Sequence, residues 1–495
     1  MSSSISSASL SDEKGLSTPD EAMLVGVAAV LLLCCPAAVS TAYLHTACCC
    51  SRGDTMFAGY DLQAVVLACE DGRRLYPLTQ DCPATLLPVL NKPLLHYQLE
   101  LLEKAGYTEA LVVCSRITEA GVFKYTETYA GELTLELVVV NGSLDTAEVL
   151  RQVSGKIRSD FLLLPGDLVC EEVLRDLAEL HVSKSSDVTM VVKEEAPIKD
   201  AKGRKTGRPK RDEEDIDYVG LTRSGRLVVK LPKLFVEEAL RIQKALLRRH
   251  ETVTLSTTMQ DVNVYVLAHW VLGFLDEHRA IASVQNELVP ALVRRQFRNC
   301  ITGGEPLAKR ATSVLTASLR EEALISRISS GKPSADGERA HPGEGAPGAN
   351  EVRCFALTLR HGDAYCSQAK TLAAYCTMNR ELLTTRELTE KCPWSMPSGF
   401  RPKDSTLVGE GCHIGPKGTL KLSVIGRQCK IGEKAKINNC IVMDGVTIED
   451  NCTIQNSVIC RRATVETGCN LNECYIGPEY KVPSGTKEKQ ETYVV

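Results

Sequence analysis

The sequence is poor in aromatic residues, carries almost no net charge and has no cysteines at the Cys-x-x-Cys spacing. Phe, Trp and Tyr make up 5% of the 495 residues, and the formal net charge is -4 at pH 7. Such a weakly negative chain does not attract a polyanion, so we expect no direct nucleic-acid partner. None of the 21 cysteines forms a Cys-x-x-Cys motif, which excludes a zinc ribbon and a thioredoxin-like site. We therefore expect reduced, partly buried thiols in an intracellular protein.

A basic leader is also missing from the N-terminus. Residues 23–39 form an apolar run that Pro36 interrupts and that three cysteines at 48–50 follow. This pattern could indicate a signal segment, a marginal membrane span or a palmitoylated anchor. Residues 1–22 hold four acids and one lysine, however, which is the reverse of a secretory leader. We expect residues 1–55 to be an added extension, and a protein that starts at Met56 to be cytosolic with no membrane partner.

From residue 61 to about residue 297, short apolar runs rich in β-branched residues alternate with helical patterns. This alternation predicts βαβ units and a largely parallel sheet, so residues 56–300 form an α/β domain. One amphipathic helix begins after Pro93 and ends at Gly106. The predicted strands are Leu62–Ala68, Glu109–Ser115, Leu135–Val140, Asp160–Pro165, Asp187–Lys193, Tyr218–Leu221, Leu227–Leu231 and Asp261–Leu267.

Three segments interrupt or follow this domain. Residues 199–215 are dense in charge, and because acids follow the bases, a solvated loop is favoured over a nuclear-localisation or nucleic-acid role. Residues 301–351 are expected to be a largely disordered linker, since 329–350 are rich in Gly, Pro, Ser and Ala. Residues 352–404 contain a strand-like and a helix-like stretch, and we interpret them as a connecting segment.

The C-terminal part has the strongest pattern in the sequence. Apolar residues recur in steps of six, six and five, which gives a repeat of 17 residues from Val408 to Ile476. Hexapeptide periodicity of this kind predicts a parallel β-helix of about four coils over residues 405–480, followed by a tail at 481–495. Glycines follow many of the apolar positions and are expected at tight corners. Small residues before each coil's first apolar position predict interior packing, and they are Ser423, Cys440, Ser457 and Cys474.

The turn after the first predicted strand is the candidate phosphate site. A glycine-rich turn there would let backbone N–H groups approach a phosphate. The turn reads Cys69-Glu70-Asp71-Gly72-Arg73-Arg74, so two carboxylates stand where bare backbone is needed. Only Gly72 and Arg74 suit a phosphate. An ordinary exposed turn between strand and helix is the alternative interpretation.

Several motifs near this turn match a known family. They are Gly72, Arg74-Leu75, Pro77-Leu78-Thr79 and Leu86-Leu87-Pro88. With the hexapeptide repeats behind them, the chain from Asp61 to Tyr480 resembles the sugar-nucleotide pyrophosphorylases. The resemblance implies a doubly wound, nucleotidyltransferase-like mixed sheet followed by a left-handed parallel β-helix of hexapeptide repeats.

The departures from the family fall on its working residues. Two loop glycines are replaced by acids, the substrate-facing Lys-Pro is Ala84-Thr85, and the Gly-Thr-Ala segment at the nucleobase is Asp145-Thr146-Ala147. Phosphoryl transfer depends on positioning and charge neutralisation. Losing the lysine and adding three acids removes both. The resemblance therefore implies a vestigial nucleotide site, with no catalytic residue.

The family also binds magnesium through two acidic positions. Asp167, in Gly166-Asp167 after a predicted buried strand, matches the first ligand. The second position falls at Asp261 or Asn263, and the residues do not decide between them. Two oxygen ligands could hold a hydrated Mg²⁺ weakly, whereas a capping role between strand and helix is the alternative for Asp167. Gly72, Arg74, Asp167 and Asp261 are thus the predicted vestigial nucleotide contacts, and we expect no cofactor.

The order of segments narrows the resemblance. The stretches DLQAVVLA, LLPVLNKPLL, LVPALVRRQF and SVIGRQCKIGEKAKI are similar to the gamma-type subunits of eukaryotic translation initiation factor 2B. That complex exchanges guanine nucleotides on initiation factor 2. The epsilon-type subunits continue into a helical domain that carries the exchange activity, whereas this chain ends about 20 residues after its last predicted coil. The resemblance implies a non-catalytic subunit whose partners are the epsilon subunit, the other subunits and initiation factor 2.

Two enzymatic alternatives remain. One is an active sugar-1-phosphate nucleotidyltransferase that makes a product such as GDP-mannose, which would use Arg74, Asp167 and Mg²⁺. The other is a β-helix acyltransferase, which would need a catalytic histidine in a coil loop. His413 is the only histidine in the coils, and its place within the first hexapeptide favours a surface position.

Overall fold

The computed structural model describes residues 62–69, 72–142, 145–195, 198–199, 205–207, 215–236, 240, 242, 244–250, 252–296, 352–360, 362–384 and 406–494. Within these residues, no helix is both long and apolar enough to cross a membrane. The apolar run at 23–39, the acids Glu70 and Asp71, and the whole 301–351 linker region lie outside them. The predictions made for those segments therefore stay predictions.

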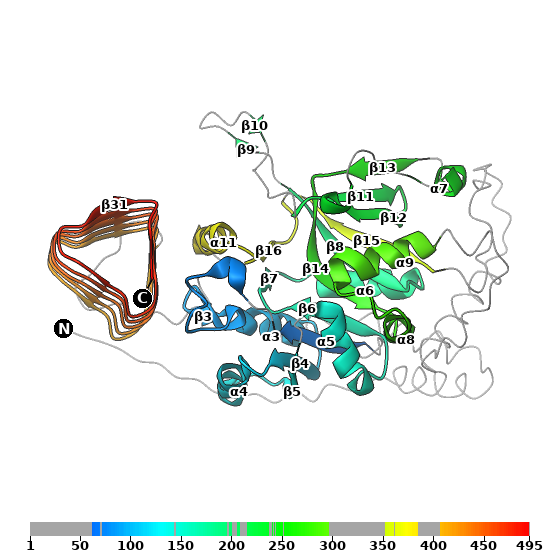
Figure 1. Cartoon of the computed structure of the whole chain (residues 1–495), viewed down its shortest axis with the longest axis horizontal. Helices are drawn as coiled ribbons and strands as arrows, with labels where there is room; N and C mark the ends of the chain where they lie inside the picture. The colour runs from blue at the N-terminus through cyan, green and yellow to red at the C-terminus, as the bar shows by residue number, and fades with distance from the viewer. Residues whose placement is uncertain are drawn as a thin grey trace, which may run out of the picture. The chain divides into compact units, whose positions relative to one another are not determined.

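A mixed sheet of seven strands forms the centre of the α/β domain (Figure 1). Its order is β15 (Cys354–Leu359), β8 (Val188–Glu194), β14 (Met259–Leu267), β6 (Phe161–Pro165), β1 (Gln63–Ala68), β4 (Glu109–Ser115) and β5 (Thr134–Val140). Strand β14 is antiparallel to both neighbours, whereas β1 pairs in parallel with β4 and β6. The predicted strands are confirmed within one or two residues at their ends.

Helices cover both faces of this sheet, which explains the continuous apolar runs of its strands. Val65 and Leu67 of β1 pack on the side of α5 (Thr146–Val153), α8 (Trp270–Glu277) and α9 (Val289–Arg295). Ala64 and Val66 pack on the opposite side with α3 (Leu94–Lys104), α4 (Glu119–Thr128) and α6 (Leu174–Ser183). The domain is therefore doubly wound, as predicted.

Smaller elements surround the sheet. A three-stranded antiparallel sheet has the order β12 (Leu227–Pro232), β11 (Asp217–Thr222) and β13 (Val253–Ser256), and β7 (Leu168–Cys170) pairs with β16 (Cys366–Gln368). The remaining elements are η1 (Arg73–Leu75), η2 (Ala84–Leu86), β2 (Pro88–Val89), β3 (Lys92–Pro93), η3 (Ser154–Lys156), β9 (Ile198–Lys199), β10 (Lys205–Gly207), η5 (Lys233–Phe235), α7 (Lys244–Arg249), the π-helix η6 (Val284–Leu288) and α11 (Leu372–Thr384).

Strand β15 corrects the predicted domain plan. We expected residues 352–404 to connect the two domains, but β15 is an edge strand of the central sheet and pairs in parallel with β8. Asp187 fixes the strand, because one carboxylate oxygen accepts from the Arg353 backbone N–H at 2.9 Å and the other from Trp270 Nε1 at 2.9 Å. A strand so far from its neighbour in sequence gives no local sign of where it pairs.

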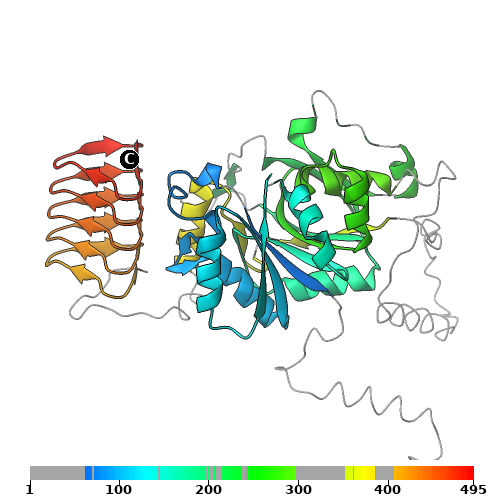
Figure 2. The same cartoon turned by 60° about the horizontal axis from the view of Figure 1, so that its bottom comes forward.

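The β-helix consists of parallel strands stacked in coils (Figure 2). Each strand pairs with the one a full repeat later, as in Val424 with Ile441 and Ile425 with Val442, which confirms the predicted repeat. Three sheets hold six, five and five strands. The strands are β17 (Leu407–Val408), β18 (His413–Ile414), β19 (Thr419–Lys421), β20 (Val424–Ile425), β21 (Lys430–Ile431), β22 (Lys436–Asn438), β23 (Ile441–Val442), β24 (Thr447–Ile448), β25 (Thr453–Gln455), β26 (Val458–Ile459), β27 (Thr464–Val465), β28 (Asn470–Asn472), β29 (Tyr475–Ile476), β30 (Lys481–Val482), β31 (Lys487–Lys489) and β32 (Thr492–Tyr493).

The coils continue beyond residue 480, where the sequence placed the end of the β-helix. Strands β30, β31 and β32 pair with the preceding coil, so residues 481–493 are not a tail and four coils was too few. The reason is visible in the register: Glu488 is paired with Leu471, and Tyr493 with Ile476. The aliphatic pattern therefore breaks within the last coil, where Val482 is still buried opposite Val465 but Glu488 and Tyr493 replace aliphatic residues.

The glycines that follow the apolar positions of the coils, such as Gly409 and Gly426, allow close stacking rather than tight turns. A Cβ on Gly409 would lie 2.6 Å from the Gly426 carbonyl oxygen, and one on Gly426 would lie 2.6 Å from the Asp444 backbone nitrogen. Neither glycine has a positive φ. Positive φ is found instead at corner residues such as Asn439 and Asn456, where asparagine tolerates the left-handed conformation.

Small interior residues pack as predicted. Ser423, Cys440, Ser457 and Cys474 are buried, and the Ser423 hydroxyl accepts a hydrogen bond from the Cys440 backbone N–H at 3.1 Å. All cysteines in the described ranges are free thiols, and most are buried. His413 is exposed at the start of β18, which is the surface position that the sequence favoured.

One face of the β-helix also carries apolar residues on its outside. Leu407, Val424, Ile441 and Val458 are buried in one hydrophobic cluster with residues of α11 and of the segment 75–97. In the same region, Asn91 Nδ2 donates to the Ile425 carbonyl at 2.8 Å. The sequence carries a sign of this face, since the first strand in each of the first four coils, β17, β20, β23 and β26, consists of two successive apolar residues.

Candidate functional site

The predicted site residues lie in segments near the carboxyl ends of the parallel strands β1 and β6, although no hydrogen bond joins Gly72, Asp167 and Asp261 to one another in the described residues. Because β1 and β6 are parallel, with Leu67 opposite Pro165, the segments that follow them emerge side by side. A Cβ on Gly166 would lie 2.6 Å from the Leu67 carbonyl oxygen, so the Gly166-Asp167 segment lies against the end of β1. Strand β14 is antiparallel to β6, with Tyr265 opposite Leu163, which brings Asp261 toward the same edge.

Gly72 adopts a left-handed backbone conformation in the turn after β1. Its φ is +61°, and a Cβ would lie 2.8 Å from the Thr79 methyl carbon. The Gly72 carbonyl accepts a hydrogen bond from the Thr79 hydroxyl at 2.9 Å. Glycine is therefore needed for the turn itself, which closes onto the Thr79 side chain that the family motif supplies.

Arg74 is engaged with a carboxylate of the chain. Its two terminal nitrogens donate to the two oxygens of Asp215, at 3.0 and 2.9 Å. Asp215 comes from the charged run at 199–215, so sequence reasoning gave no reason to pair it with Arg74. The pair is partly exposed, with side chains 39% and 24% accessible, and such pairs stabilise a fold by less than about 1 kcal/mol.

Asp167 is buried between the central sheet and the β7–β16 pair. Its side chain accepts a hydrogen bond from Gln368 Nε2 at 2.7 Å, and its backbone carbonyl accepts from the Ala369 N–H at 2.9 Å. It lies between β6 and β7 rather than between a strand and a helix, so the capping role considered for it is wrong. Its contacts fix the segment that leads into α11.

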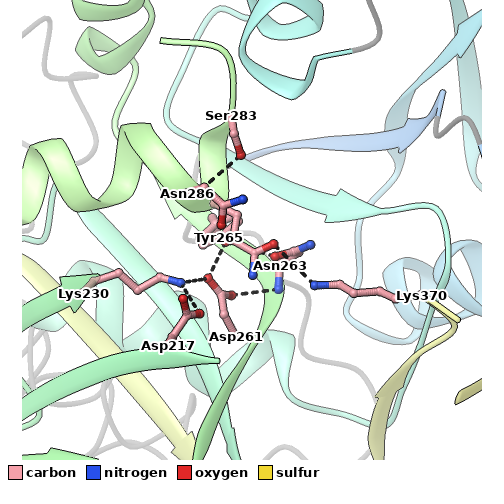
Figure 3. A network of polar contacts seen from close by, with 9 residues as sticks. Asp217, Lys230, Asp261, Asn263, Tyr265, Ser283, Asn286 and Lys370 are labelled. Carbon is pink, nitrogen blue, oxygen red and sulfur yellow. Dashed lines mark hydrogen bonds and ion pairs between the residues drawn. The ribbon is translucent and has the colours of Figure 1, made fainter. Parts of the chain in front are cut away.

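Asp261 is the centre of a buried polar network (Figure 3). Lys230 Nζ lies 2.6 Å from Asp261 Oδ2, and the Tyr265 hydroxyl donates to the same oxygen at 2.6 Å. The backbone N–H of Asn263 donates to the other oxygen, Oδ1, at 2.9 Å. Lys230 Nζ also lies 2.8 Å from Asp217 Oδ2.

Burial and the neighbouring carboxylates have opposite effects on the pKa of Lys230. Its side chain and that of Asp261 are fully inaccessible. Burial lowers the pKa of Lys230, but Asp261 and Asp217 outweigh this effect and raise the pKa above its ordinary value. Burial and the neighbouring Asp261 also raise the pKa of Tyr265. The lysine is therefore charged and the tyrosine neutral at pH 7.

Asn263 does not offer an open ligand position either. Its φ is +58°, at an irregularity of β14 between Asp261 and Tyr265. The Tyr265 hydroxyl lies 3.3 Å from its side-chain oxygen. The irregularity turns the Asn263 backbone N–H onto Asp261, so both alternatives for the second metal position belong to the same network.

Sequence reasoning missed Lys230, Asp217 and Tyr265. A signal existed for the first two, because a lysine in the run LVVKLP and an acid opening DYVGLT stand in strands that are otherwise apolar. A charged residue inside a buried strand needs a partner of opposite charge. The sequence does not say which partner, since Asp261 comes from a different sheet.

The Asp145-Thr146-Ala147 segment, which matches the nucleobase segment of the family, is hydrogen-bonded to residues 282–284. Asp145 is exposed and precedes α5. The Ala147 backbone N–H donates to the Ala282 carbonyl at 2.9 Å, and the Thr146 hydroxyl accepts from the Val284 N–H at 2.9 Å. At the former Lys-Pro position, Ala84 and Thr85 are buried in η2, so no cation faces a substrate from there.

The described residues do not fit a magnesium site. Mg²⁺ takes oxygen ligands at about 2.0–2.1 Å in octahedral geometry. Both oxygens of Asp261 already accept hydrogen bonds, and the Lys230 ammonium beside it would repel a divalent cation. Across the described part of the chain, no group of three or more His, Cys, Asp or Glu side chains could hold a metal ion.

Two protein-family models match the chain. The nucleotidyl transferase model matches residues 63–201, and the model of the EIF2B subunit epsilon LbH domain matches residues 395–487. Together with the mixed sheet and the stacked coils, these matches define the class: a nucleotidyltransferase-like domain followed by a left-handed β-helix.

Similar proteins identify the family within this class. The chain is 30% identical over 383 residues to translation initiation factor eIF2B subunit gamma of Dictyostelium discoideum, which covers 72% of this chain and 84% of that protein. It is 27% identical to the subunit gamma of Schizosaccharomyces pombe, over 73% of this chain and 72% of that protein. The chain belongs to the family of eIF2B gamma subunits.

A more distant similarity is confined to part of the chain. The mannose-1-phosphate guanyltransferase of Hypocrea jecorina is 32% identical over 145 residues, which is 28% of this chain and 39% of that protein. The predicted resemblance to translation initiation factor subunits is therefore confirmed over most of the chain, and the resemblance to a nucleotidyltransferase over a smaller part.

Proposed function

We propose that the chain is a non-catalytic subunit of the guanine-nucleotide exchange factor for initiation factor 2. It acts in the cytosol, where it pairs with the epsilon subunit within a larger complex and helps that complex to engage initiation factor 2. Family membership supports this role, because the similar proteins are named as gamma and epsilon subunits of eIF2B. Neither a cofactor nor direct nucleic-acid contact is part of the proposal.

The observation that carries the non-catalytic role is the network around Asp261. Phosphoryl transfer needs cations that neutralise the charge developing on the phosphates. At this sheet edge the Asp261 carboxylate is bound by Lys230, Tyr265 and the Asn263 backbone, all at 2.6–2.9 Å. A carboxylate with these partners supports a structural role and does not support metal-assisted transfer.

The other predicted contacts are vestigial in the same sense. Gly72 keeps the turn of a phosphate loop, and Asp167 keeps its place beside the end of β1, but each is bonded within the fold. Arg74 would have to leave Asp215 before it could reach a phosphate. We propose that Gly72, Asp167 and Asp261 stabilise the fold through these bonds, whereas Arg74 contributes little through its partly exposed pair with Asp215.

The β-helix is proposed as the assembly surface. Its coils bury their apolar interior only against neighbouring coils, so partners can bind its outer faces and its ends without any change in the core. The outward residues of the sheet that runs from β18 to β30 are polar, and they are His413, Lys430, Thr447, Thr464 and Lys481.

Affinity purification of the tagged full chain from a cytosolic extract tests this function. We expect the epsilon subunit and the other subunits of the complex to be recovered with it. A matched control is the Arg74→Ala chain, which loses only a partly exposed ion pair at the predicted nucleotide site and should recover the same subunits. Recovery of the wild-type chain without any other subunit would contradict the proposal.

The similarity to mannose-1-phosphate guanyltransferases favours a second candidate, an active sugar-1-phosphate nucleotidyltransferase that makes a product such as GDP-mannose. The purified chain would then release pyrophosphate from a nucleoside triphosphate, a sugar 1-phosphate and Mg²⁺, and Asp167→Asn would abolish the release. We expect no release from the wild-type chain. Pyrophosphate release that depends on Asp167 would establish the enzyme and overturn the non-catalytic role.

A further inference from the structure

The positive charge beside Asp261 is supplied by a side chain. Lys230 Nζ bridges Asp261 Oδ2 at 2.6 Å and Asp217 Oδ2 at 2.8 Å. These are the distances of charge-assisted hydrogen bonds, which are stronger than neutral ones. Figure 3 shows the three side chains pointing toward one another, with Tyr265 completing the surroundings of Asp261.

The lysine is held in place by the way two sheets meet. Asp217 and Lys230 belong to β11 and β12 of the three-stranded sheet, and Asp261 belongs to β14 of the central sheet. Lys230 is fully inaccessible and Asp217 only 6% accessible. The Lys230 ammonium therefore cannot move into solvent unless the two sheets separate.

A divalent ion and this ammonium need the same oxygen. The ion would have to approach Asp261 to about 2.0–2.1 Å and keep most of its other ligands as water. The Lys230 ammonium already contacts Asp261 Oδ2, and Tyr265 donates to it as well. Two cations at one buried carboxylate repel each other strongly, because little solvent screens them.

We propose that the Lys230 ammonium is a built-in cation that occupies the place of a divalent metal ion beside Asp261 and keeps this sheet edge closed to such ions. Asp217 is the second carboxylate of the cation site, which sequence comparison with the pyrophosphorylases did not indicate. The proposal concerns this chain alone and does not depend on its membership of a complex.

Manganese binding tests the proposal, with the full-length chain and Mn²⁺ as the probe. The free-ion signal in electron paramagnetic resonance measures how much Mn²⁺ each variant binds. We expect Lys230→Ser to bind one Mn²⁺ at least about tenfold more tightly than the wild-type chain, because the repulsion is removed while both carboxylates remain. In the Lys230→Ser background, Asp217→Asn should abolish the gain.

A matched control removes a lysine from an exposed ion pair. Lys481 pairs with Glu466 on the β-helix surface at 2.7 Å, and Lys481→Ser should leave Mn²⁺ binding unchanged. A folded Lys230→Ser chain that gains no Mn²⁺ site would overturn the proposal. So would a wild-type Mn²⁺ site that is lost in Asp217→Asn.

A comparison of Asp217→Asn with the wild-type chain tests the proposal even if Lys230→Ser does not fold. Asp217→Asn leaves Lys230 paired with Asp261, so this variant keeps a balanced ion pair in the core. Equal Mn²⁺ binding by Asp217→Asn and the wild-type chain supports a closed site. Weaker binding by Asp217→Asn would show that the wild-type carboxylates already hold the ion. Neither outcome depends on which proteins co-purify with the chain.

Discussion

The edge of the central sheet and the β-helix use their polar groups in opposite ways. At the sheet edge, Lys230 and Tyr265 both contact the Asp261 carboxylate, and Lys230 also contacts Asp217, so that the lysine joins strands of two sheets. In the β-helix the same bond recurs from coil to coil: the Asn439 side chain donates to that of Asn456 at 2.6 Å, and Asn456 donates to Asn472 at 3.2 Å. The polar contacts of the sheet edge each occur once, whereas the β-helix repeats the same kind of contact between successive coils.

This difference teaches where a nucleotidyltransferase-like fold can change. Interactions that occur once can be exchanged without altering the frame, as the ammonium at Asp261 illustrates. Interactions that repeat are constrained by the coil above and the coil below, because each strand pairs with both. We therefore expect single substitutions to have larger effects at the sheet edge than in the coils.

Lys230→Ala should have the largest effect on stability. It leaves two carboxylates, Asp217 and Asp261, buried without their cation. Removing one partner of a buried ion pair costs about 3–5 kcal/mol. Urea unfolding followed by circular dichroism measures the loss in the free energy of unfolding. A loss below about 1 kcal/mol would contradict a stabilising role for the Lys230–Asp217–Asp261 cluster.

The control for this prediction removes all three charges at once. In Lys230→Met with Asp217→Asn and Asp261→Asn, no unpaired charge is buried. Replacing a complete buried ion cluster by groups of similar volume is often nearly neutral. The triple variant should therefore unfold at a higher urea concentration than Lys230→Ala.

Gly426→Ala should have an intermediate effect and tests the stack. The new methyl group would lie 2.6 Å from the Asp444 backbone nitrogen, so neighbouring coils would have to separate. Overpacking of this kind costs about 1–3 kcal/mol. Gly273→Ala is the control, because Gly273 has open space around its Cβ position and no positive φ, so this change should not lower the melting temperature. A melting temperature of Gly426→Ala equal to or above that of Gly273→Ala would contradict close stacking as the reason for Gly426.

The contrast also explains what the sequence could and could not predict. The coils were predictable to the residue, because every inward position is specified again one repeat later, as in Ile425 and Val442. The prediction ended one coil early where Glu488 replaces the aliphatic residue. The aliphatic pattern reports which positions are buried. The last described coil pairs with only one other coil, so fewer of its positions need to be aliphatic.

The site was predictable only in part. Gly72 and Asp167 follow strands whose parallel pairing could be expected, so their meeting at one edge was predictable. The partner of Asp261 was not, because Lys230 reaches it from another sheet through contacts that leave no periodic trace. The same holds for Arg74, whose partner Asp215 follows a segment of charged residues.

Asn456→Ala should have a smaller effect within the coils. Asn456 has φ +50° and bonds the asparagines of both neighbouring coils. Alanine loses these bonds and is less tolerant of the left-handed conformation, which costs about 1–2 kcal/mol in total. Asn456→Gly loses the bonds but not the conformational tolerance, so it should be the milder variant. A thermal melting temperature for glycine at or below that for alanine would rule out conformational strain at this corner.

The smallest predicted effect is the pH dependence of the unfolding free energy, which should be absent near pH 7 for Lys230 and Tyr265. The pKa values of both Lys230 and Tyr265 are raised in the folded chain, so the folded state keeps these protons to higher pH than the unfolded state does. Their contribution is complete below the unfolded pKa values of about 10 and is lost as pH rises through the folded values. Urea midpoints measured from pH 7 to pH 11 should therefore be unaffected by these two groups up to about pH 10 and then fall. Tyr265→Phe should shift the onset toward the pKa of the lysine, and an onset that Tyr265→Phe leaves unchanged would show that the tyrosine does not contribute.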